Sequence, residues 1–146
     1  MPLIVVGADT RAGETILEGM DPTKREIRVF VTDEAKGLQL RELGFKVATG
    51  DVSDEGHVEA AALRCFSAVL IAEATTDGRE RSFADSPDDI LHSWSNAVAN
   101  SQVTRVIWVI SGSSPATQAR EVVAVDPDAP DLARTVARLD EAHSIS

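Results

Sequence analysis

The sequence predicts an α/β fold in which helices cover both faces of a doubly wound, parallel sheet of about five strands. Two observations lead to this prediction. Short apolar runs alternate with segments of helical pattern along most of the chain, as in repeated strand–helix–strand units. Several of these runs are apolar at nearly every position, which is typical of strands buried on both faces of a parallel sheet.

The alternation begins at the amino terminus. An apolar run at residues 4–6 ends at Gly7 and is expected to form the first strand, with a helix following over residues 11–20. Pro22 then interrupts the helical pattern. Residues 27–31, I-R-V-F-V, alternate and are rich in β-branched types, so they are expected to form the second strand.

The next two helices are predicted from the residues that start them. Asp33 favours the start of a helix that ends at Gly44 and turns its leucines toward the core, namely Leu38, Leu40 and Leu43. Residues 45–51 are the third expected strand. Ser53 is expected to cap a third helix that runs through Ala61.

The clearest buried strand in the sequence is the fourth, at residues 67–74. Acidic residues are then frequent over residues 75–89 and again over residues 126–131, and we expect both segments to be solvated loops rather than cation sites. A fourth helix is predicted over residues 88–100, and a fifth strand over residues 105–111.

The segment that follows the fifth strand fits two structures. It can start a helix at Ser114 and Pro115, or it can contribute a strand at residues 121–125, E-V-V-A-V. We favour the helix. One apolar face then predicts a final helix at about residues 130–143.

Length and composition exclude several classes of protein. The 146 residues are expected to form one domain, residues 1–146, and the formal charge of −10 excludes nucleic acid as a partner. No apolar run approaches the roughly 20 residues of a membrane span, so we expect no membrane contact and a cytoplasmic protein. Cys65 is the single cysteine and the three histidines are scattered, so neither a disulfide nor a zinc site is predicted.

Four motifs occur in a fixed order along the chain. They are G-A-D-T-R-A-G at residues 7–13, I-R-V-F-V-T-D at 27–33, G-D-V-S-D at 50–54 and V-T-R-V-I-W-V-I-S-G-S-S at 103–114. Together they resemble the nucleotide-binding part of NmrA-like proteins, an atypical branch of the short-chain dehydrogenase superfamily. The resemblance covers about residues 3–114. It implies a Rossmann-like fold of the NAD(P)-binding type, with strand order 3-2-1-4-5, and NAD or NADP as the cofactor.

The first motif departs from the family's glycine loop. Gly7 and Gly13 match the glycines that turn the chain and let helix and strand pack, but Thr10 stands where the family has its middle glycine. If that position needs a positive φ, Thr10 costs about 1–2 kcal/mol. Asp9 would oppose a phosphate, whereas Arg11 could bind one. Alternatively, Thr10 or Asp9 caps the following helix, and dinucleotide binds weakly or not at all.

The resemblance places further candidate cofactor-binding residues after the other strands. Asp33 lies at the distance from the glycine loop at which an acidic residue meets the adenosine ribose, and Thr32 stands where an arginine would bind the 2′-phosphate of NADP. NAD is therefore favoured over NADP. Asp51 and Val52 would lie beside the adenine, and Ala72, near the end of the fourth strand, completes the set. Their alternatives are ordinary ones: Asp33 caps the next helix, and Asp51 ends a strand.

No catalytic residue is predicted. Enzymes of the superfamily use a Tyr-x-x-x-Lys pair beside a serine, and this chain contains no tyrosine. Three serines match the serine position but lack that partner, and they fit a capped turn: Ser111, Ser113 and Ser114. His57 and His92 lie in segments that need not meet Ser111, and Cys65 is expected to be an inert buried thiol.

Two functions remain open. The first is a non-catalytic Rossmann-like protein, either an NAD(P) sensor or an interaction module with a weakened nucleotide loop. The second is an NAD(P)-dependent oxidoreductase or epimerase-like enzyme that completes its site through a dimer or a partner, because the residues after Ser111 leave little room for a substrate pocket. A homodimer is expected to use Trp94 as its anchor, although Trp94 also fits the core.

Overall fold

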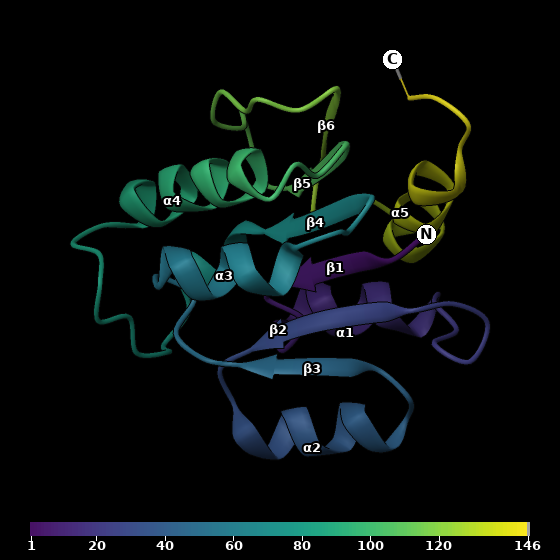
Figure 1. Ribbon diagram of the computed structural model, residues 1–146, viewed down its shortest axis with the longest axis horizontal. Helices are drawn as coiled ribbons and strands as arrows, with labels where there is room; N and C mark the ends of the chain where they lie inside the picture. The colour runs from purple at the N-terminus through teal and green to yellow at the C-terminus, as the bar shows by residue number, and fades with distance from the viewer. Residues whose placement is uncertain (146) are drawn as a thin grey trace.

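A computed structural model of the chain describes residues 1–145 and confirms the α/β class. Six strands form one parallel sheet in the order β3-β2-β1-β4-β5-β6 (Figure 1). The strands are β1 (Leu3–Val6), β2 (Ile27–Val31), β3 (Lys46–Thr49), β4 (Ser67–Ile71), β5 (Arg105–Val109) and β6 (Glu121–Val125). The helices are α1 (Arg11–Glu18), α2 (Glu34–Glu42), α3 (Glu55–Ala62), α4 (Pro87–Asn100) and α5 (Leu132–Glu141), and a 3₁₀ turn, η1 (Ala72–Thr75), follows β4.

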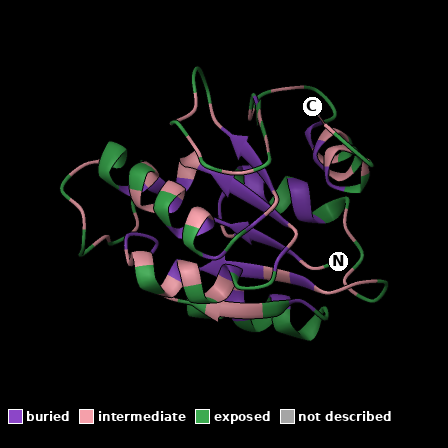
Figure 2. Cartoon of the chain, turned by 45° about the horizontal axis from the view of Figure 1, so that its top comes forward, coloured by how far each residue is buried: buried purple, intermediate pink, exposed green. Residues whose placement is uncertain are grey.

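The sheet separates two apolar cores, because successive side chains of a strand point to opposite faces. Leu3 and Val5 of β1 pack in one core with residues of α1, α2 and α5, whereas Ile4 and Val6 pack in the other with residues of α3 and α4. β1, β4 and β5 are buried along their whole length, while the outward faces of the helices are exposed (Figure 2). The continuous apolar runs of the sequence therefore come from strands covered on both faces.

The helix that we favoured after the fifth strand is wrong. Residues 121–125 form β6, which pairs with β5 in the register Val106↔Val122 and Trp108↔Ala124. Exposure alternates along β6, as expected for a strand at the edge of a sheet. Taken alone, this β-branched run fits either a helix or a strand. Its pairing with the otherwise unpaired side of β5 decides that it is a strand.

Two details of the predicted helices also need correction. Leu40 is buried, but Leu38 and Leu43 are 59% and 64% exposed, because α2 approaches the sheet at Gly37. A Cβ on Gly37 would lie 3.2 Å from side-chain atoms of β3, so the buried face is centred on Gly37 and Leu40. α3 is capped by Asp54, whose side chain accepts a hydrogen bond from the amide of His57, and not by Ser53.

Trp94 belongs to the core and cannot anchor a dimer. Its side chain is fully buried, stacks with Trp108 at a centroid separation of 6.4 Å and donates a 2.8 Å hydrogen bond to the carbonyl oxygen of Val52. Within residues 1–145, no helix is long and apolar enough to cross a membrane.

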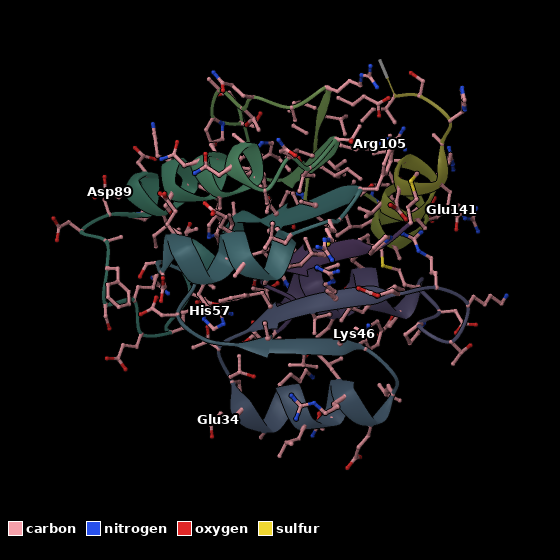
Figure 3. The ribbon with its side chains drawn as sticks, in the orientation of Figure 1. Glu34, Lys46, His57, Asp89, Arg105 and Glu141 are labelled. Carbon is pink, nitrogen blue, oxygen red and sulfur yellow. The ribbon has the colours of Figure 1, made fainter. Side chains whose placement is uncertain are left out.

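Because all strands are parallel, their carboxyl ends lie together on one side of the sheet and their amino ends on the opposite side. We call these two sides the carboxyl edge and the amino edge. His57 and Asp89 mark the carboxyl edge, whereas Lys46, Arg105 and Glu141 lie toward the amino edge (Figure 3). The carboxyl edge collects the loops after β1, β2, β3, β4 and β5. In open α/β sheets, ligands bind at this edge.

Candidate functional site

The two glycines of the loop after β1 are required by its geometry. Gly7 has a φ of +87°, and a Cβ on it would lie 3.0 Å from the Cβ of Ala74. A Cβ on Gly13 would lie 2.5 Å from the carbonyl oxygen of Gly7. The loop therefore turns sharply at Gly7 and packs α1 directly against β1 at Gly13, as the first motif predicts.

Thr10 is unstrained and closes the amino terminus of α1. Its φ is −91°, so the cost of a positive φ at this position does not arise. Its Oγ1 accepts a 2.9 Å hydrogen bond from the amide of Gly13 and donates a 2.7 Å bond to the carbonyl oxygen of Gly7. Thr10 is thus the N-cap of α1, and it takes an amide that would otherwise be available to a phosphate.

A second amide at the amino terminus of α1 donates a hydrogen bond to a residue that the sequence analysis did not predict to be there. Glu73, in η1, accepts a 3.2 Å hydrogen bond at Oε1 from the amide of Ala12. The partial positive charge of a helix amino terminus favours an anion, and here the chain supplies that anion itself. No local pattern pairs residues 61 positions apart, so sequence reasoning missed Glu73.

Asp9 faces the end of β2 rather than the helix. Its Oδ2 accepts hydrogen bonds from the amides of Thr32 at 2.9 Å and Asp33 at 3.1 Å, and its Oδ1 lies 2.8 Å from Nη1 of Arg79. The side chain of Asp9 is only 5% exposed. The expectation that Asp9 caps α1 is therefore wrong, and its carboxylate instead ties the first loop to the second.

Arg79 belongs to a covering segment, residues 77–83, that lies over this part of the edge. Its side chain is 9% exposed. Nε and Nη2 each donate a 2.8 Å hydrogen bond to Asp77, while Nη1 contacts Asp9 and, at 3.1 Å, Oγ1 of Thr32. Burial would lower the pKa of Arg79, but the hydrogen bonds to the two carboxylates raise it above its ordinary value.

Asp77 holds the covering segment together from within. Burial would raise the pKa of Asp77, but hydrogen bonds and charge from Arg79, together with the charge of Arg81, hold it below its ordinary value. Arg81 contacts the same carboxylate at 3.3 Å and also donates to the carbonyl oxygens of Ala74 and Asp77. The segment is thus cross-linked by two arginines on one aspartate.

The segment ends on the loop after β3. The amide of Ser82 donates a 2.7 Å hydrogen bond to Oδ2 of Asp51, and the amide of Phe83 donates a 3.0 Å bond to Oγ of Ser53. Burial would raise the pKa of Asp51, but hydrogen bonds from Ser53 and Ser82 hold it below its ordinary value. The loop that we expected to be merely solvated therefore closes over the ends of β2 and β3, at the left of Figure 1.

The structure brings most of the predicted cofactor-binding residues to this edge, each with a partner inside the protein. Asp33 caps α2 by accepting hydrogen bonds from the amides of Ala35 and Lys36. Val52 is buried, and Ala72 is the first residue of η1. Arg11 is 85% exposed and lies 3.9 Å from Asp128.

The other half of the edge, at the ends of β4 and β5, is open. It contains a cleft of about 480 Å³ whose lining includes Ala72, Glu73, Asp88, Leu91, Ser111 and Asp128. This volume falls within the usual range for small-molecule sites. The edge is therefore divided into a covered half at β1, β2 and β3 and an open half at β4 and β5.

The remaining candidate reactive residues are not brought together. Ser111 lines the open cleft, whereas His57 packs against the ring of Phe30 at a centroid distance of 4.9 Å, and His92 is exposed on α4. Cys65 is buried, and burial raises the pKa of its thiol to about 11, as expected for an inert cysteine. Across residues 1–145, no group of three His, Cys, Asp or Glu side chains is placed to hold a metal ion.

No protein-family model matches the chain, and no curated protein matches its sequence. Solved structures do match. The anaerobillin reductase ChuY of Escherichia coli O157:H7 superposes with a TM-score of 0.58 and 21% identity, over 76% of this chain and 51% of its own. The E. coli NADPH-dependent quinone oxidoreductase QOR2, complexed with NADPH, gives 0.57 and 20%, over 73% of this chain and 36% of its own.

A third neighbour is the Citrobacter sp. triphenylmethane reductase complexed with NADP(H), with a TM-score of 0.59 and 14% identity over 75% of this chain and 37% of its own. The fold is Rossmann-like. The chain spans about half or less of the length of these neighbours. Relative to the expected order 3-2-1-4-5, this Rossmann-like sheet has one additional strand, β6, beside β5.

A dinucleotide does not fit the covered half as its residues now stand. In folds of this type, the pyrophosphate lies on the amides at the start of the first helix, and the ribose lies near the end of the second strand. In this chain Thr10 and Glu73 take amides of α1, and Arg79 lies on Asp9 and Thr32. Entry of a dinucleotide therefore requires these contacts to break.

Proposed function

We propose that this chain is a non-catalytic, Rossmann-like binding module whose dinucleotide site is self-satisfied and therefore weak. The observation that carries the proposal is the capture of the Ala12 and Gly13 amides by Glu73 and Thr10. A pyrophosphate would have to replace both acceptors, and it would gain little because each amide already has a partner.

Charge acts in the same direction. A phosphate near α1 would meet the carboxylate of Glu73, and one carboxylate about 4 Å from a phosphate is opposed by roughly 1–4 kcal/mol, depending on the local dielectric. At about 1.4 kcal/mol per decade, one such repulsion weakens binding by about ten- to a thousandfold. Asp9 adds little to this repulsion, because its carboxylate faces the end of β2 and is paired with Arg79.

The non-catalytic part of the proposal is supported by residue types. The chain has no tyrosine, and therefore lacks the general acid or base that the resemblance would supply beside Ser111. His57 and Cys65 are held in packed environments away from the open cleft. Among the described residues, Ser111 is not paired with His57 or Cys65 as nucleophile and base.

The structure removes our reason for preferring NAD over NADP. Thr32 stands where the resemblance would place an arginine, but Nη1 of Arg79 lies 3.1 Å from Oγ1 of Thr32 and brings a guanidinium to the same point. Two of the neighbours described above are complexed with NADPH or NADP(H). We therefore propose either dinucleotide as the weak ligand, without preference.

Calorimetric titration with NAD⁺, NADH, NADP⁺ and NADPH tests the proposal. We expect dissociation constants of about 1 mM or weaker for all four. Glu73→Gln removes a negative charge at the amide of Ala12, and we expect it to tighten binding by about tenfold. Glu42→Gln, an exposed residue of α2, is the matched charge control and should change nothing. A micromolar dissociation constant for the unaltered protein would overturn the proposal.

A second candidate is an enzyme that completes its site through a dimer or a partner chain. The open cleft of about 480 Å³ beside Ser111 favours it, because it lies where chemistry at the ends of β4 and β5 would take place. Sedimentation equilibrium followed by a crystal structure tests this candidate. A monomer, or a dimer whose interface leaves Ser111 and Gly7 outside any shared cleft, would exclude completion through a dimer.

A further inference from the structure

We propose that the covering segment, residues 77–83, occupies the adenosine half of the site and that Arg79 determines whether a nucleotide can enter. The inference rests on the proposed function, since it explains which part of the chain keeps dinucleotide affinity low. It goes further by assigning the exclusion to one side chain and one segment, separate from the loop around α1.

Arg79 is the anchor because it is the side chain of the segment that reaches both neighbouring loops. It lies 2.8 Å from Asp9, after β1, and 3.1 Å from Thr32, after β2. Both members of the Arg79–Asp9 pair are nearly buried, with side chains 9% and 5% exposed. A pair shielded in this way is screened less by solvent than the exposed Arg11–Asp128 pair at the open half.

The covering segment uses the acceptors that the resemblance assigns to a nucleotide. The amides of Ser82 and Phe83 donate to Asp51 and Ser53, in the loop where the adenine would lie. The guanidinium of Arg79 lies at the end of β2, where the ribose would lie. Segment and nucleotide therefore compete for the same side chains, and only one of them can be bound at a time.

The chain retains the glycines and the acidic residue that an adenosine site of this type uses. Gly7 and Gly13 still turn and pack the loop, and Asp33 remains at the end of β2 as the N-cap of α2. The anchoring contacts are all polar, and Phe83 is 67% exposed, so the end of the segment buries little apolar surface. Loss of the Arg79 anchor is therefore expected to release the segment while leaving both apolar cores intact.

The test compares the unaltered protein with Arg79→Gln. Limited trypsin digestion reports release of the segment, because the side chain of Arg81 is only 16% exposed in the closed structure. Calorimetric titration with ADP-ribose reports opening of the adenosine half. We expect Arg79→Gln to be cleaved after Arg81 about tenfold faster and to bind ADP-ribose about tenfold more tightly. Arg134→Gln, an exposed residue of α5, is the matched control and should behave like the unaltered protein.

Ser82→Pro provides a second route to the same state. It removes the amide that donates to Asp51 and changes no residue of the predicted nucleotide site, so it should also tighten ADP-ribose binding. Trypsin does not cut an Arg–Pro bond, so release of the segment in this variant is read from faster cleavage after Arg79, whose side chain is 9% exposed in the closed structure. Far-UV circular dichroism and thermal unfolding confirm that each variant is folded. Folded variants with unchanged cleavage and binding would overturn the inference, and so would faster cleavage without tighter binding. Tight binding by the unaltered protein would instead overturn the proposed function itself.

Discussion

The two halves of the carboxyl edge have the same origin in the fold and differ in what covers them. At β1, β2 and β3, the covering segment and its nearly buried Arg79–Asp9 pair close the edge. At β4 and β5, a cleft of about 480 Å³ stays open and carries an exposed ion pair, Arg11–Asp128. The comparison shows that a Rossmann-like sheet can retain the glycines that turn and pack the loop after β1, while residues distant in sequence cover the carboxyl ends of its strands.

The largest expected effect concerns the glycine loop after β1, where the covered half borders the open half. Gly13→Ala places a Cβ 2.5 Å from the carbonyl oxygen of Gly7, so we expect it to lower the free energy of unfolding by about 3 kcal/mol. Gly56→Ala is the matched control, because Gly56 is also helical and its Cβ would meet its nearest neighbour at 3.8 Å. That change should stabilise the protein by about 1 kcal/mol. Equal effects in urea unfolding would contradict the close approach of α1 to β1.

The next effect separates the covered half from the open one. Asp9→Ala leaves the amides of Thr32 and Asp33 without their acceptor and Arg79 without one partner. We expect it to lower the free energy of unfolding by about 2–3 kcal/mol. Urea unfolding monitored by tryptophan fluorescence measures this loss. An effect below about 0.5 kcal/mol would show that Asp9 is not held as the structure describes.

Acid should open the covered half. The pKa values of Asp77 and Asp51 are lowered in the folded protein, so these groups stabilise the closed segment above their ordinary pKa of about 3.9. That contribution is lost as the pH falls through the lower folded values. Amide hydrogen exchange should therefore show protection of the Ser82 and Phe83 amides at neutral pH that declines below about pH 4, after correction for intrinsic exchange. Protection that is independent of pH would contradict the prediction.

The smallest expected effect belongs to the open half. Arg11 and Asp128 are 85% and 78% exposed and lie 3.9 Å apart, so solvent screens their attraction. Arg11→Ala should change the free energy of unfolding by less than about 0.5 kcal/mol. The same urea experiment that is used for Asp9→Ala checks it. A loss as large as that of Asp9→Ala would remove the contrast between the two halves.

The sequence predicted what depends on local pattern. The continuous apolar runs located the strands, and Gly7, Gly13, Thr10 and Asp33 were each given a role that the structure bears out as turn, packing or cap. The contacts that close the site could not be predicted from local sequence patterns. Glu73 contacts Ala12 across 61 positions, and Arg79 contacts Asp9 across 70. For the same reason the strand at residues 121–125 was only the less favoured of two alternatives, since β6 depends on pairing with β5.

Trp94 shows the limit of reasoning from residue type. An aromatic residue on a helix fits an interface as well as a core, and only its stacking on Trp108 and its hydrogen bond to Val52 decide between them. Asp9 is a similar case. Its position in the loop predicted either a helix cap or a charge that repels phosphate. In the structure its carboxylate instead accepts hydrogen bonds from the amides of Thr32 and Asp33, after β2.

A crystal structure of the unaltered protein equilibrated with about 0.1 mM NADPH, a tenth of the expected dissociation constant, tests the central claim most directly, because it shows which acceptors lie on the amides of α1. We predict that Glu73 remains on the amide of Ala12, Thr10 remains on that of Gly13, and residues 77–83 stay over the ends of β2 and β3. Density for a pyrophosphate on those two amides, with Arg79 withdrawn from Asp9, would contradict the account.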